Sequence, residues 1–369
     1  MRIGIDCSEL SGKPTGVGRF LRVILAGLAQ TETPHQFSLY GPEDIRAPEG
    51  PGFVVRHVPR RSRKLLQEQL ELPRLLSKDG VDLFYTPGYW LPLRARIPSI
   101  FTLHDVSFVA HPEWFSTRER LKRITLSRLS ARKAVAVFTV SEFSRTEILR
   151  HYRLPPERVL VAKEGVDPDV ARGGCDVAAF RSRLGLSGPL ILSVGSLFQR
   201  RRTDVLLQAF SDLSRRHPEA RLWVAGENRT HPKVDYGRMA AKMGIGHRVF
   251  FGGYTQEATV RQLYQAADLL VFLSEYEGFG LPPLEACACG LPVVSSRGSS
   301  LEEIFRDHAM LVDARDPKEI ADAMDSLLSD PARRRLMRSK GLELAAAYSA
   351  QAAAAKFLSL IGEVMGSSQ

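Results

Sequence analysis

The amino-acid sequence predicts an α/β protein of two doubly wound domains, each a parallel sheet with helices on both faces. Its 369 residues exceed the roughly 250–300 residues at which one hydrophobic core stops growing. Short apolar or β-branched runs alternate with amphipathic helical segments along nearly the whole length. This alternation is typical of right-handed βαβ units, which build parallel sheets.

Eight runs have the composition of buried strands. They are RIGID (2–6), SIFTLHD (99–105) and AVFTVS (136–141) in the first half, and LILSVGS (190–196), RLWVAG (221–226), RVFFGG (248–253), LLVFLS (269–274) and PVVSS (292–296) in the second. Within residues 161–180 a strand-like run gives way to Gly, Pro and Asp, which marks a boundary. We therefore predict an N-terminal domain over residues 1–165 and a C-terminal domain over residues 166–348. Ligands of such domains collect at the carboxyl ends of the strands, and facing domains would hold one ligand between them.

The composition is that of a soluble globular protein. No stretch reaches the ~18–20 uninterrupted apolar residues of a membrane span, and MRIGIDCSEL at the start lacks the apolar region of a signal peptide. The sequence therefore predicts a cytoplasmic protein. The four cysteines offer no second close pair to complete a zinc site, so we expect reduced, structural thiols and no metal there.

Most of the positive charge lies in the first half. Residues 1–165 hold 26 Lys and Arg against 17 Asp and Glu, a net of +9 out of +10 for the chain. The densest clusters, 56–70 and 116–133, carry Leu and Ile at helical spacing. They could lie on an anionic membrane surface, bind a phosphorylated ligand or be solvated helix faces. Few aromatic residues interrupt them, which disfavours nucleic acid.

A glycine-rich loop follows the first strand. Gly12, Gly16 and Gly18 precede the apolar helical segment 19–30. Backbone N–H groups of Gly16, Val17 and Gly18 at a helix N-terminus would suit a phosphate, although a plain tight turn has the same composition. The spacing is not that of the dinucleotide fingerprint G-x-G-x-x-G.

The corresponding turn of the second half carries three consecutive arginines. The strand at 190–194 ends at Gly195, and Arg200, Arg201 and Arg202 precede a helix with Thr203 as the expected N-cap. Arginine offers a fork of donors for phosphate oxygens, and the position at a strand's carboxyl end favours diphosphate binding over a solvated helix start.

Two glutamates flank a Gly- and Pro-rich stretch in EYEGFGLPPLEACACGLPVV (275–294). We expect Glu277 in a loop and Glu285 in the first turn of a helix, with the N–H groups of Phe279, Gly280 and Leu281 lining the same edge of the sheet. Carboxylates accept hydrogen bonds from vicinal hydroxyls, and amides donate to sugar or phosphate oxygens. A sugar attached to a nucleoside diphosphate requires both. The alternative is that Glu285 only complements the helix dipole and Glu277 is solvated.

These residues carry a resemblance to a known family. EGFGLPPLE (277–285) looks like the E-x7-E signature of the retaining GT-B glycosyltransferases of the group 1 type, and the likeness covers essentially the entire chain. Further similar segments are TGVGRF (15–20), TLHDVSFVAHPEWFS (102–116), VSEFSRTEI (140–148), KEGVD (163–167) and VGSLFQRRRTDVLLQAF (194–210). The resemblance implies the GT-B fold: two facing Rossmann-like domains with the active site in the cleft between them, and a C-terminal helix over 349–369 that crosses back to the first domain.

The resemblance also implies a role for each matched residue. Glu277 would hold hydroxyls of the donor sugar and Glu285 the ribose, while Arg200 and Arg201 would neutralise the diphosphate with help from the loop at Gly16. His104 would lie near the sugar. Members of the family retain anomeric configuration and need no metal or other cofactor, so the departing phosphate would take the acceptor's proton.

The chain departs from the family pattern at three places. Arg201 and Arg202 replace a lysine and an asparagine, Lys163 and Glu164 stand where an asparagine is usual, and the final segment lacks the customary tryptophan.

Together, the motifs and the resemblance imply a metal-independent, retaining hexosyltransferase. The HPEWFS segment (111–116) resembles bacterial mannosyltransferases of surface polysaccharides, which implies GDP-mannose as the leading donor, with UDP-glucose or a related sugar nucleotide as the competing one. The implied acceptor is a saccharide or lipid-linked saccharide in surface polysaccharide or glycoconjugate synthesis. The basic first domain would favour peripheral contact with the inner face of an anionic membrane. The alternatives are a UDP-sugar epimerase or phosphorylase of the same fold, or a non-catalytic subunit that binds sugar nucleotides.

Overall fold

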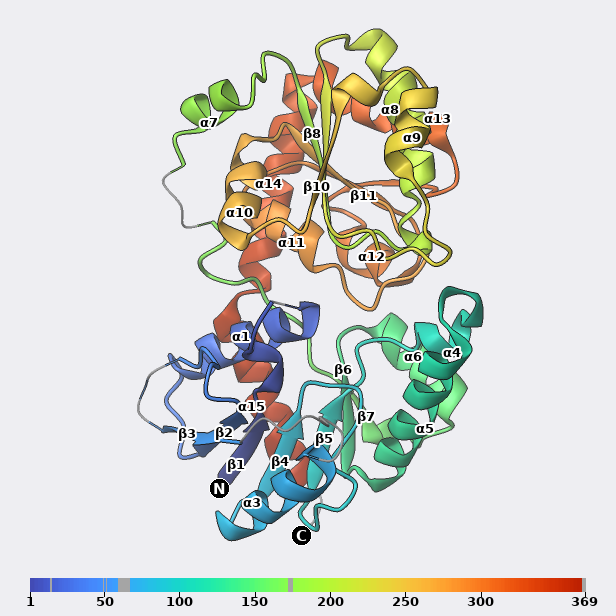
Figure 1. Ribbon diagram of the computed structural model, residues 1–369. Coiled ribbons are helices and arrows are strands. Elements are labelled where there is room, and N and C mark those ends of the chain that lie inside the picture. Colours follow the sequence, from blue (N-terminus) through green and yellow to red (C-terminus); the bar gives the residue numbers. More distant parts are fainter. Residues whose placement is uncertain (14, 49, 51, 59–66, 172–174, 367–369) are drawn as a thin grey trace. The chain divides into compact units, whose positions relative to one another are not determined.

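The computed structural model describes residues 1–13, 15–48, 50, 52–58, 67–171 and 175–366, which form two compact units (Figure 1). Unit 1 combines Met1–Asp167 with the segment from Tyr348 onward, and unit 2 is Pro168–Ala347. The sequence predicted these two boundaries after residues 165 and 348. Part of the predicted basic cluster at 56–70 lies outside the described residues.

Unit 1 contains a seven-stranded sheet in which every pairing is parallel, in the order β3-β2-β1-β4-β5-β6-β7. Its strands are β1 (Arg2–Asp6), β2 (Gln36–Gly41), β3 (Phe53–His57), β4 (Leu83–Thr86), β5 (Ser99–Thr102), β6 (Ala136–Thr139) and β7 (Val159–Val161). The order runs outward from β1 to β3 and then restarts at β4 on the other side of β1. This is the doubly wound order of Rossmann-like domains, with its switch point between β1 and β4.

Helices cover both faces of the unit 1 sheet. They are α1 (Gly16–Leu28), α3 (Leu72–Lys78), α4 (Ser107–Ala110), α5 (Thr117–Lys133), α6 (Glu142–Tyr152) and α15 (Ala350–Gly366). Apolar side chains of α3, α5 and α6 share one core with the sheet. On the other face α15 lies beside α1 (Figure 1), and the Phe357 ring is 4.8 Å from that of Tyr85 on β4. An added Cβ at Gly27 would lie 2.1 Å from the Ala350 carbonyl oxygen, so glycine permits this close approach.

Unit 2 repeats the same topology with six parallel strands in the order β10-β9-β8-β11-β12-β13. Its strands are β8 (Leu190–Val194), β9 (Arg221–Ala225), β10 (Val249–Gly253), β11 (Leu269–Phe272), β12 (Val293–Ser296) and β13 (Met310–Val312). Its helices are α7 (Val177–Arg183), α8 (Thr203–Arg216), α9 (Tyr236–Lys242), α10 (Glu257–Ala266), α11 (Leu281–Ala288), α12 (Ser299–Phe305), α13 (Pro317–Ser329) and α14 (Pro331–Ala347). Side chains of α8, α9 and α13 form one core with the sheet. The switch point of this unit lies between β8 and β11.

All eight predicted strands are present, and within the described residues the structure contains five more that the sequence missed: β2, β3, β4, β7 and β13. Four of them, β2, β3, β7 and β13, are edge or second-from-edge strands. The edge strand β3 exposes Val54 and Val55 at 43% and 39%, so it lacks the run of buried residues on which the prediction relied. β7 and β13 have three residues each, which is too short for a composition signal.

The stretch Pro331–Gly366 has the length and apolar character of a membrane span, and 44% of an apolar 18-residue segment within it is buried. It comprises α14 of unit 2 and α15 of unit 1. Seven apolar residues of α15 are buried, and this helix packs against α1. Packing inside unit 1 accounts for the apolar character of α15.

Candidate functional site

The loops after β8 and β11 meet at the carboxyl edge of the unit 2 sheet. The two strands are neighbours, and the strand order reverses between them, where open parallel sheets bind ligands. The N–H of Glu275 in the second loop donates to the carbonyl oxygen of Arg200 in the first, at 2.9 Å. The sheet topology and this hydrogen bond bring the predicted arginines beside the predicted glutamate.

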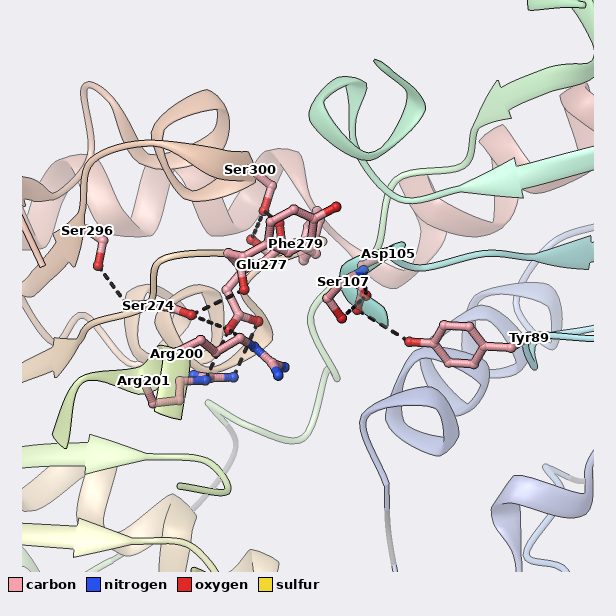
Figure 2. Close-up of polar contacts among 11 residues, drawn as sticks. Tyr89, Asp105, Ser107, Arg200, Arg201, Ser274, Glu277, Phe279, Ser296 and Ser300 are labelled. Carbon is pink, nitrogen blue, oxygen red and sulfur yellow. Dashed lines mark hydrogen bonds and ion pairs between the residues drawn. The ribbon is translucent and has the colours of Figure 1, made fainter. Parts of the chain in front are cut away.

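Glu277 is held by two arginines and a serine (Figure 2). Arg201 approaches both oxygens, with Nε 3.0 Å from Oε1 and Nη2 3.3 Å from Oε2. The first of these contacts is an ion pair without hydrogen-bond alignment. Arg200 Nε lies 3.5 Å from Oε1, and Ser274 Oγ donates to Oε1 at 2.7 Å. The carboxylate is therefore fixed in position.

The cluster carries more positive than negative charge. The Arg201 guanidinium lies 4.1 Å from the ring centroid of Phe272, and that of Arg200 lies 4.7 Å from the ring of Phe198. Burial lowers the pKa of Arg201 to about 10, against the opposing effect of Glu277, so the group stays charged at neutral pH. Two guanidinium groups facing one carboxylate leave an excess positive charge, which suits an anionic ligand.

The third arginine points elsewhere, and the predicted N-cap was wrong. Arg202, and not Thr203, occupies the N-cap of α8, in the left-handed region at φ 42° and without a side-chain cap. A tight turn over Gln199–Arg201 comes immediately before it and sets where the helix begins. Arg202 pairs with Glu275 at 3.0 Å and with Asp204 at 3.3 Å. Arg200 and Arg201 alone of the three contact Glu277.

The loop that carries Glu277 is held from behind by α12. Ser300 Oγ lies 2.8 Å from the main-chain oxygens of both Glu277 and Phe279 (Figure 2). Gly280 has φ 128°, and an added Cβ would lie 2.8 Å from Leu301 Cδ2. Any other residue at 280 would strain the backbone and collide with α12, so the loop depends on this glycine.

Glu285 lies in α11, but not in its first turn as predicted. The helix begins at Leu281, one residue before the proline pair, so Glu285 is its fifth residue. Its side chain is buried and accepts a hydrogen bond from the Tyr264 hydroxyl of α10 at 2.9 Å. A dipole-complementing role in the first turn is therefore excluded. The ribose contact stays a prediction, as do the ligand contacts of Phe279, Gly280 and Leu281.

Gly195, which the sequence placed at the phosphate turn, has φ 124° directly after β8. The Arg201 guanidinium packs near its Cα, since an added Cβ would lie 3.5 Å from Arg201 Nη1. Its carbonyl oxygen also approaches Gly226 so closely that a Cβ there would lie 1.9 Å away. Gly195 therefore shapes the turn that holds the arginines.

In unit 1 the glycine loop leads into α1. Thr15 is the N-cap, and its Oγ1 accepts from the N–H of Gly18 at 2.9 Å and donates to Glu9 Oε2 at 2.9 Å. A Cβ at Gly18 would lie 2.4 Å from the Glu9 carbonyl oxygen, whereas one at Gly16 would meet nothing within 4 Å. Gly18 thus has a packing role, and its N–H is already paired. Phosphate binding by Gly16 and Val17 stays a prediction.

His104 lies at the carboxyl end of β5 and is 9% exposed. Its Nε2 is 2.9 Å from the carbonyl oxygen of Pro87, and its Nδ1 is 3.3 Å from Glu164 Oε1. The Phe20 ring of α1 packs edge-on against it, with centroids 5.0 Å apart. The three neighbours come from the ends or following segments of β1, β4 and β7, so the sheet topology assembles this cluster.

Four residues of these clusters were not predicted to act in the site. Ser274 and Ser300 fix Glu277 and its loop, Tyr264 binds Glu285, and Glu164 binds His104. Ser274 could have been found as the polar end of a buried strand. The other three depend on contacts between distant segments, for which the sequence holds no local signal.

Across the parts of the chain that the structure describes, no three His, Cys, Asp or Glu side chains gather where they could hold a metal ion. All four cysteines are free thiols. Activity without a metal stays a prediction about the reaction.

Solved structures define the class of the fold. WaaG, a glycosyltransferase involved in lipopolysaccharide biosynthesis, superposes with a TM-score of 0.75 at 18% identity, covering 97% of this chain and 99% of that one. HepE from Anabaena, in complex with UDP and glucose, gives a TM-score of 0.75 at 20% identity over 98% and 100% of the two chains. The two parallel-sheet α/β units therefore form a protein of the GT-B fold.

Sequence comparisons define the family. The chain matches the model of the glycosyl transferases group 1 over residues 178–343 and that of glycosyltransferase family 4 over 14–170. O-antigen chain mannosyltransferase B of Escherichia coli is 30% identical over 275 residues, which cover 72% of this chain and 70% of that protein. D-inositol 3-phosphate glycosyltransferase of Thermobispora bispora is 30% identical over 354 residues, covering 85% and 81%. The chain belongs to the group 1 glycosyltransferase family, as its motifs predicted.

Proposed function

We propose that the protein is a metal-independent, retaining hexosyltransferase that uses a nucleoside-diphosphate sugar as donor. The observation that carries this proposal is the Arg200–Arg201–Glu277 cluster at the switch point of unit 2. Two guanidinium groups beside one carboxylate match a diphosphate joined to a sugar: cations for the phosphates, an acceptor for the hydroxyls.

The chemistry follows from where charge develops. When the bond from the sugar to the phosphate breaks, negative charge grows on the diphosphate, and Arg200 and Arg201 are fixed in advance to stabilise it. Glu277 would hold the sugar hydroxyls and Glu285 the ribose. The departing phosphate would take the proton of the acceptor hydroxyl, so that the new bond forms on the same face as the old one.

GDP-mannose is the donor that we propose first. The mannosyltransferase relative from Escherichia coli, named for the O-antigen chain, supports a mannosyl donor and a growing saccharide as acceptor. A UDP-sugar is the second candidate, because HepE was solved with UDP and glucose. A thermal-shift panel of GDP, UDP, ADP and dTDP separates them, since a ligand that binds the folded state raises its apparent stability. We expect the largest shift with GDP; a larger shift with UDP would replace our first donor by the second.

We propose that the protein acts in the cytoplasm at the inner face of a membrane, on a lipid-linked or polysaccharide acceptor. Helix α5 supports this proposal, because Leu121 and Leu129 are 55% and 42% exposed among Arg118, Lys122 and Arg132 on its outer side. Exposed leucines among cations suit an anionic surface. The protein should cosediment with vesicles that contain an anionic phospholipid, and Lys122→Glu should reduce the fraction that cosediments. Equal sedimentation with neutral vesicles would contradict an electrostatic contact.

Donor turnover tests the proposal as a whole. The purified protein, given GDP-mannose and mannose-containing acceptors, should release GDP and form a glycoside with the anomeric configuration of the donor. Formation of an epimerised donor would identify the protein as an epimerase instead. Release of sugar 1-phosphate when phosphate is added would identify it as a phosphorylase. Binding without turnover would indicate a sugar-nucleotide-binding subunit.

A further inference from the structure

The His104 ring in unit 1 lies between two hydrogen-bond acceptors. Nε2 faces the carbonyl oxygen of Pro87 at 2.9 Å, and Nδ1 faces Oε1 of Glu164 at 3.3 Å. A main-chain carbonyl accepts only, and a carboxylate accepts only. A neutral imidazole has one N–H and one bare nitrogen, so it satisfies one of these partners and sets two lone pairs against each other at the other.

We propose that Glu164 holds His104 as the doubly protonated imidazolium, so that the ring is a cationic hydrogen-bond donor and not a proton acceptor. Glu164 is thereby a positioning residue for His104. The catalytic meaning of this pair rests on the proposed function, but the protonation of the ring does not. The sequence had placed His104 near the sugar without indicating its charge.

The alternative is a neutral pair, with the proton on Glu164. Both side chains are almost fully buried, at 11% and 6% exposure, so solvent does little to stabilise a lone charge on either. An imidazole is intrinsically a stronger base than a carboxylate, which favours the proton on the ring. The separation of 3.3 Å is also closer to N–H···O distances than to those of a carboxylic acid O–H donor. The ion pair therefore fits better than the neutral pair.

The other groups around the ring do not replace Glu164. Asp105 is the next residue, but its Oδ1 accepts from both the N–H and the hydroxyl of Ser107, at 2.8 and 2.6 Å, and its Oδ2 faces the Tyr89 hydroxyl at 3.4 Å (Figure 2). From α1 the neighbour is the apolar Phe20 ring, and from α6 Ser144 Oγ binds the main-chain oxygen of His104. The carboxylate that contacts the ring nitrogen is that of Glu164.

This arrangement restricts what His104 can do. With both nitrogens protonated, the ring has no lone pair with which to remove a proton from an acceptor hydroxyl. The ring can offer positive charge to the substrate. Its Nε2–H can also donate to a substrate oxygen if it gives up its hydrogen bond to the carbonyl oxygen of Pro87. The proton of the acceptor must then leave by another route, in agreement with the proposed transfer to the departing phosphate.

Glu164→Gln tests the proposal because a glutamine amide can donate as well as accept. The amide N–H can bind Nδ1, which lets the ring become neutral with its single proton on Nε2, facing Pro87. The readout is the ring ¹⁵N spectrum of the full chain labelled at histidine, at pH 7.5, with His104→Asn identifying the signals. The control is Glu142→Gln, which removes an exposed carboxylate of the same unit.

We expect both ring nitrogens of His104 to be protonated in the wild type and in Glu142→Gln, and one of them to be bare in Glu164→Gln. A bare nitrogen in the wild type, or an imidazolium that persists in Glu164→Gln, would overturn the proposal. If Glu164→Gln does not fold, the wild-type spectrum still decides.

Activity provides a second, separate readout. With a working donor, Glu164→Gln should lower kcat by on the order of 10-fold or more with little change in KM, and should change the pH dependence of kcat. An unchanged kcat, despite a neutral ring, would show that the charge of His104 plays no part in turnover. Failure to find any donor would count against the proposed function and leave the spectroscopic test intact.

Discussion

Replacing Arg201 by alanine separates phosphate binding from nucleoside binding. Arg201 is mostly shielded from solvent, with 16% of its side chain exposed. It contacts Glu277, and its guanidinium lies 4.1 Å from the centroid of the Phe272 ring. A hydrogen bond to a charged group contributes about 1.5–3 kcal/mol, which corresponds to roughly 10- to 150-fold in affinity. Arg201→Ala should therefore weaken GDP and UDP binding by that factor and leave guanosine and uridine binding nearly unchanged.

The assay is calorimetric titration of the diphosphates and the matching nucleosides into wild type, Arg201→Ala and Arg202→Ala. Arg202 is the matched control, because it is the next arginine along the chain but pairs with Glu275 and Asp204. Glu277 keeps Ser274 at 2.7 Å and Arg200 at 3.5 Å in the Arg201 variant, so the loss of stability should stay below the ~3–5 kcal/mol of an orphaned buried charge. Equal losses for diphosphate and nucleoside would refute the phosphate role.

Three further predictions concern the rest of the chain. Gly27→Ala should lower the free energy of unfolding in urea by about 1–3 kcal/mol, because the added Cβ would collide with the backbone of α15. Gly362→Ala, whose added Cβ meets nothing within 4 Å, should raise this free energy by about 0.4–1 kcal/mol. A change of the same sign in both variants would contradict the close packing of α1 on α15. Glu285→Gln should weaken the binding of nucleosides and of nucleoside diphosphates by the same factor, as a contact with the ribose requires. A loss of affinity confined to the diphosphates would contradict this ribose contact. The hydrogen bond with His217 lowers the pKa of Asp325, so the stability that the Asp325 carboxylate contributes is present above the ordinary carboxyl pKa and is lost as the pH falls through the lowered one. Wild type should exceed Asp325→Asn in urea stability at pH 6, and a difference that does not shrink as the solution is acidified below the ordinary carboxyl pKa would contradict this.

The alternation of strands and helices was enough to predict two doubly wound units, because buried parallel strands are nearly continuous apolar runs. The missed edge strand β3 lacks that burial, with Val54 exposed, whereas β2 and β4 are buried and were missed all the same. β7 and β13 are apolar but have three residues each, which is too short for a composition signal. The units themselves did not depend on these strands, since the remaining βαβ repeats already define the winding.

Sequence reasoning selected residues that the structure brings together in the unit 2 cluster, but it could not predict their contacts. Motifs identified the adjacent Arg200 and Arg201, and also Glu277, which lies more than 70 residues further along the chain. Their ion pairs exist because β8 and β11 are neighbours, which is a property of the strand order and not of any local segment. Local rules also failed at Thr203, where the tight turn before α8 moved the N-cap to Arg202.

Glu277 gives the most direct test of the central claim, which is glycosyl transfer from a nucleotide sugar bound at the unit 2 cluster. The measurement is release of nucleoside diphosphate from GDP-mannose and UDP-glucose by wild type, Glu277→Gln and Glu277→Ala, with folding checked by thermal melting. We predict release by the wild type with at least one donor, and a decrease of about 10²–10³-fold in both variants, as for removal of one preorganised group at a reacting centre. Equally slow release by wild type and variants, with all three folded, would contradict the account.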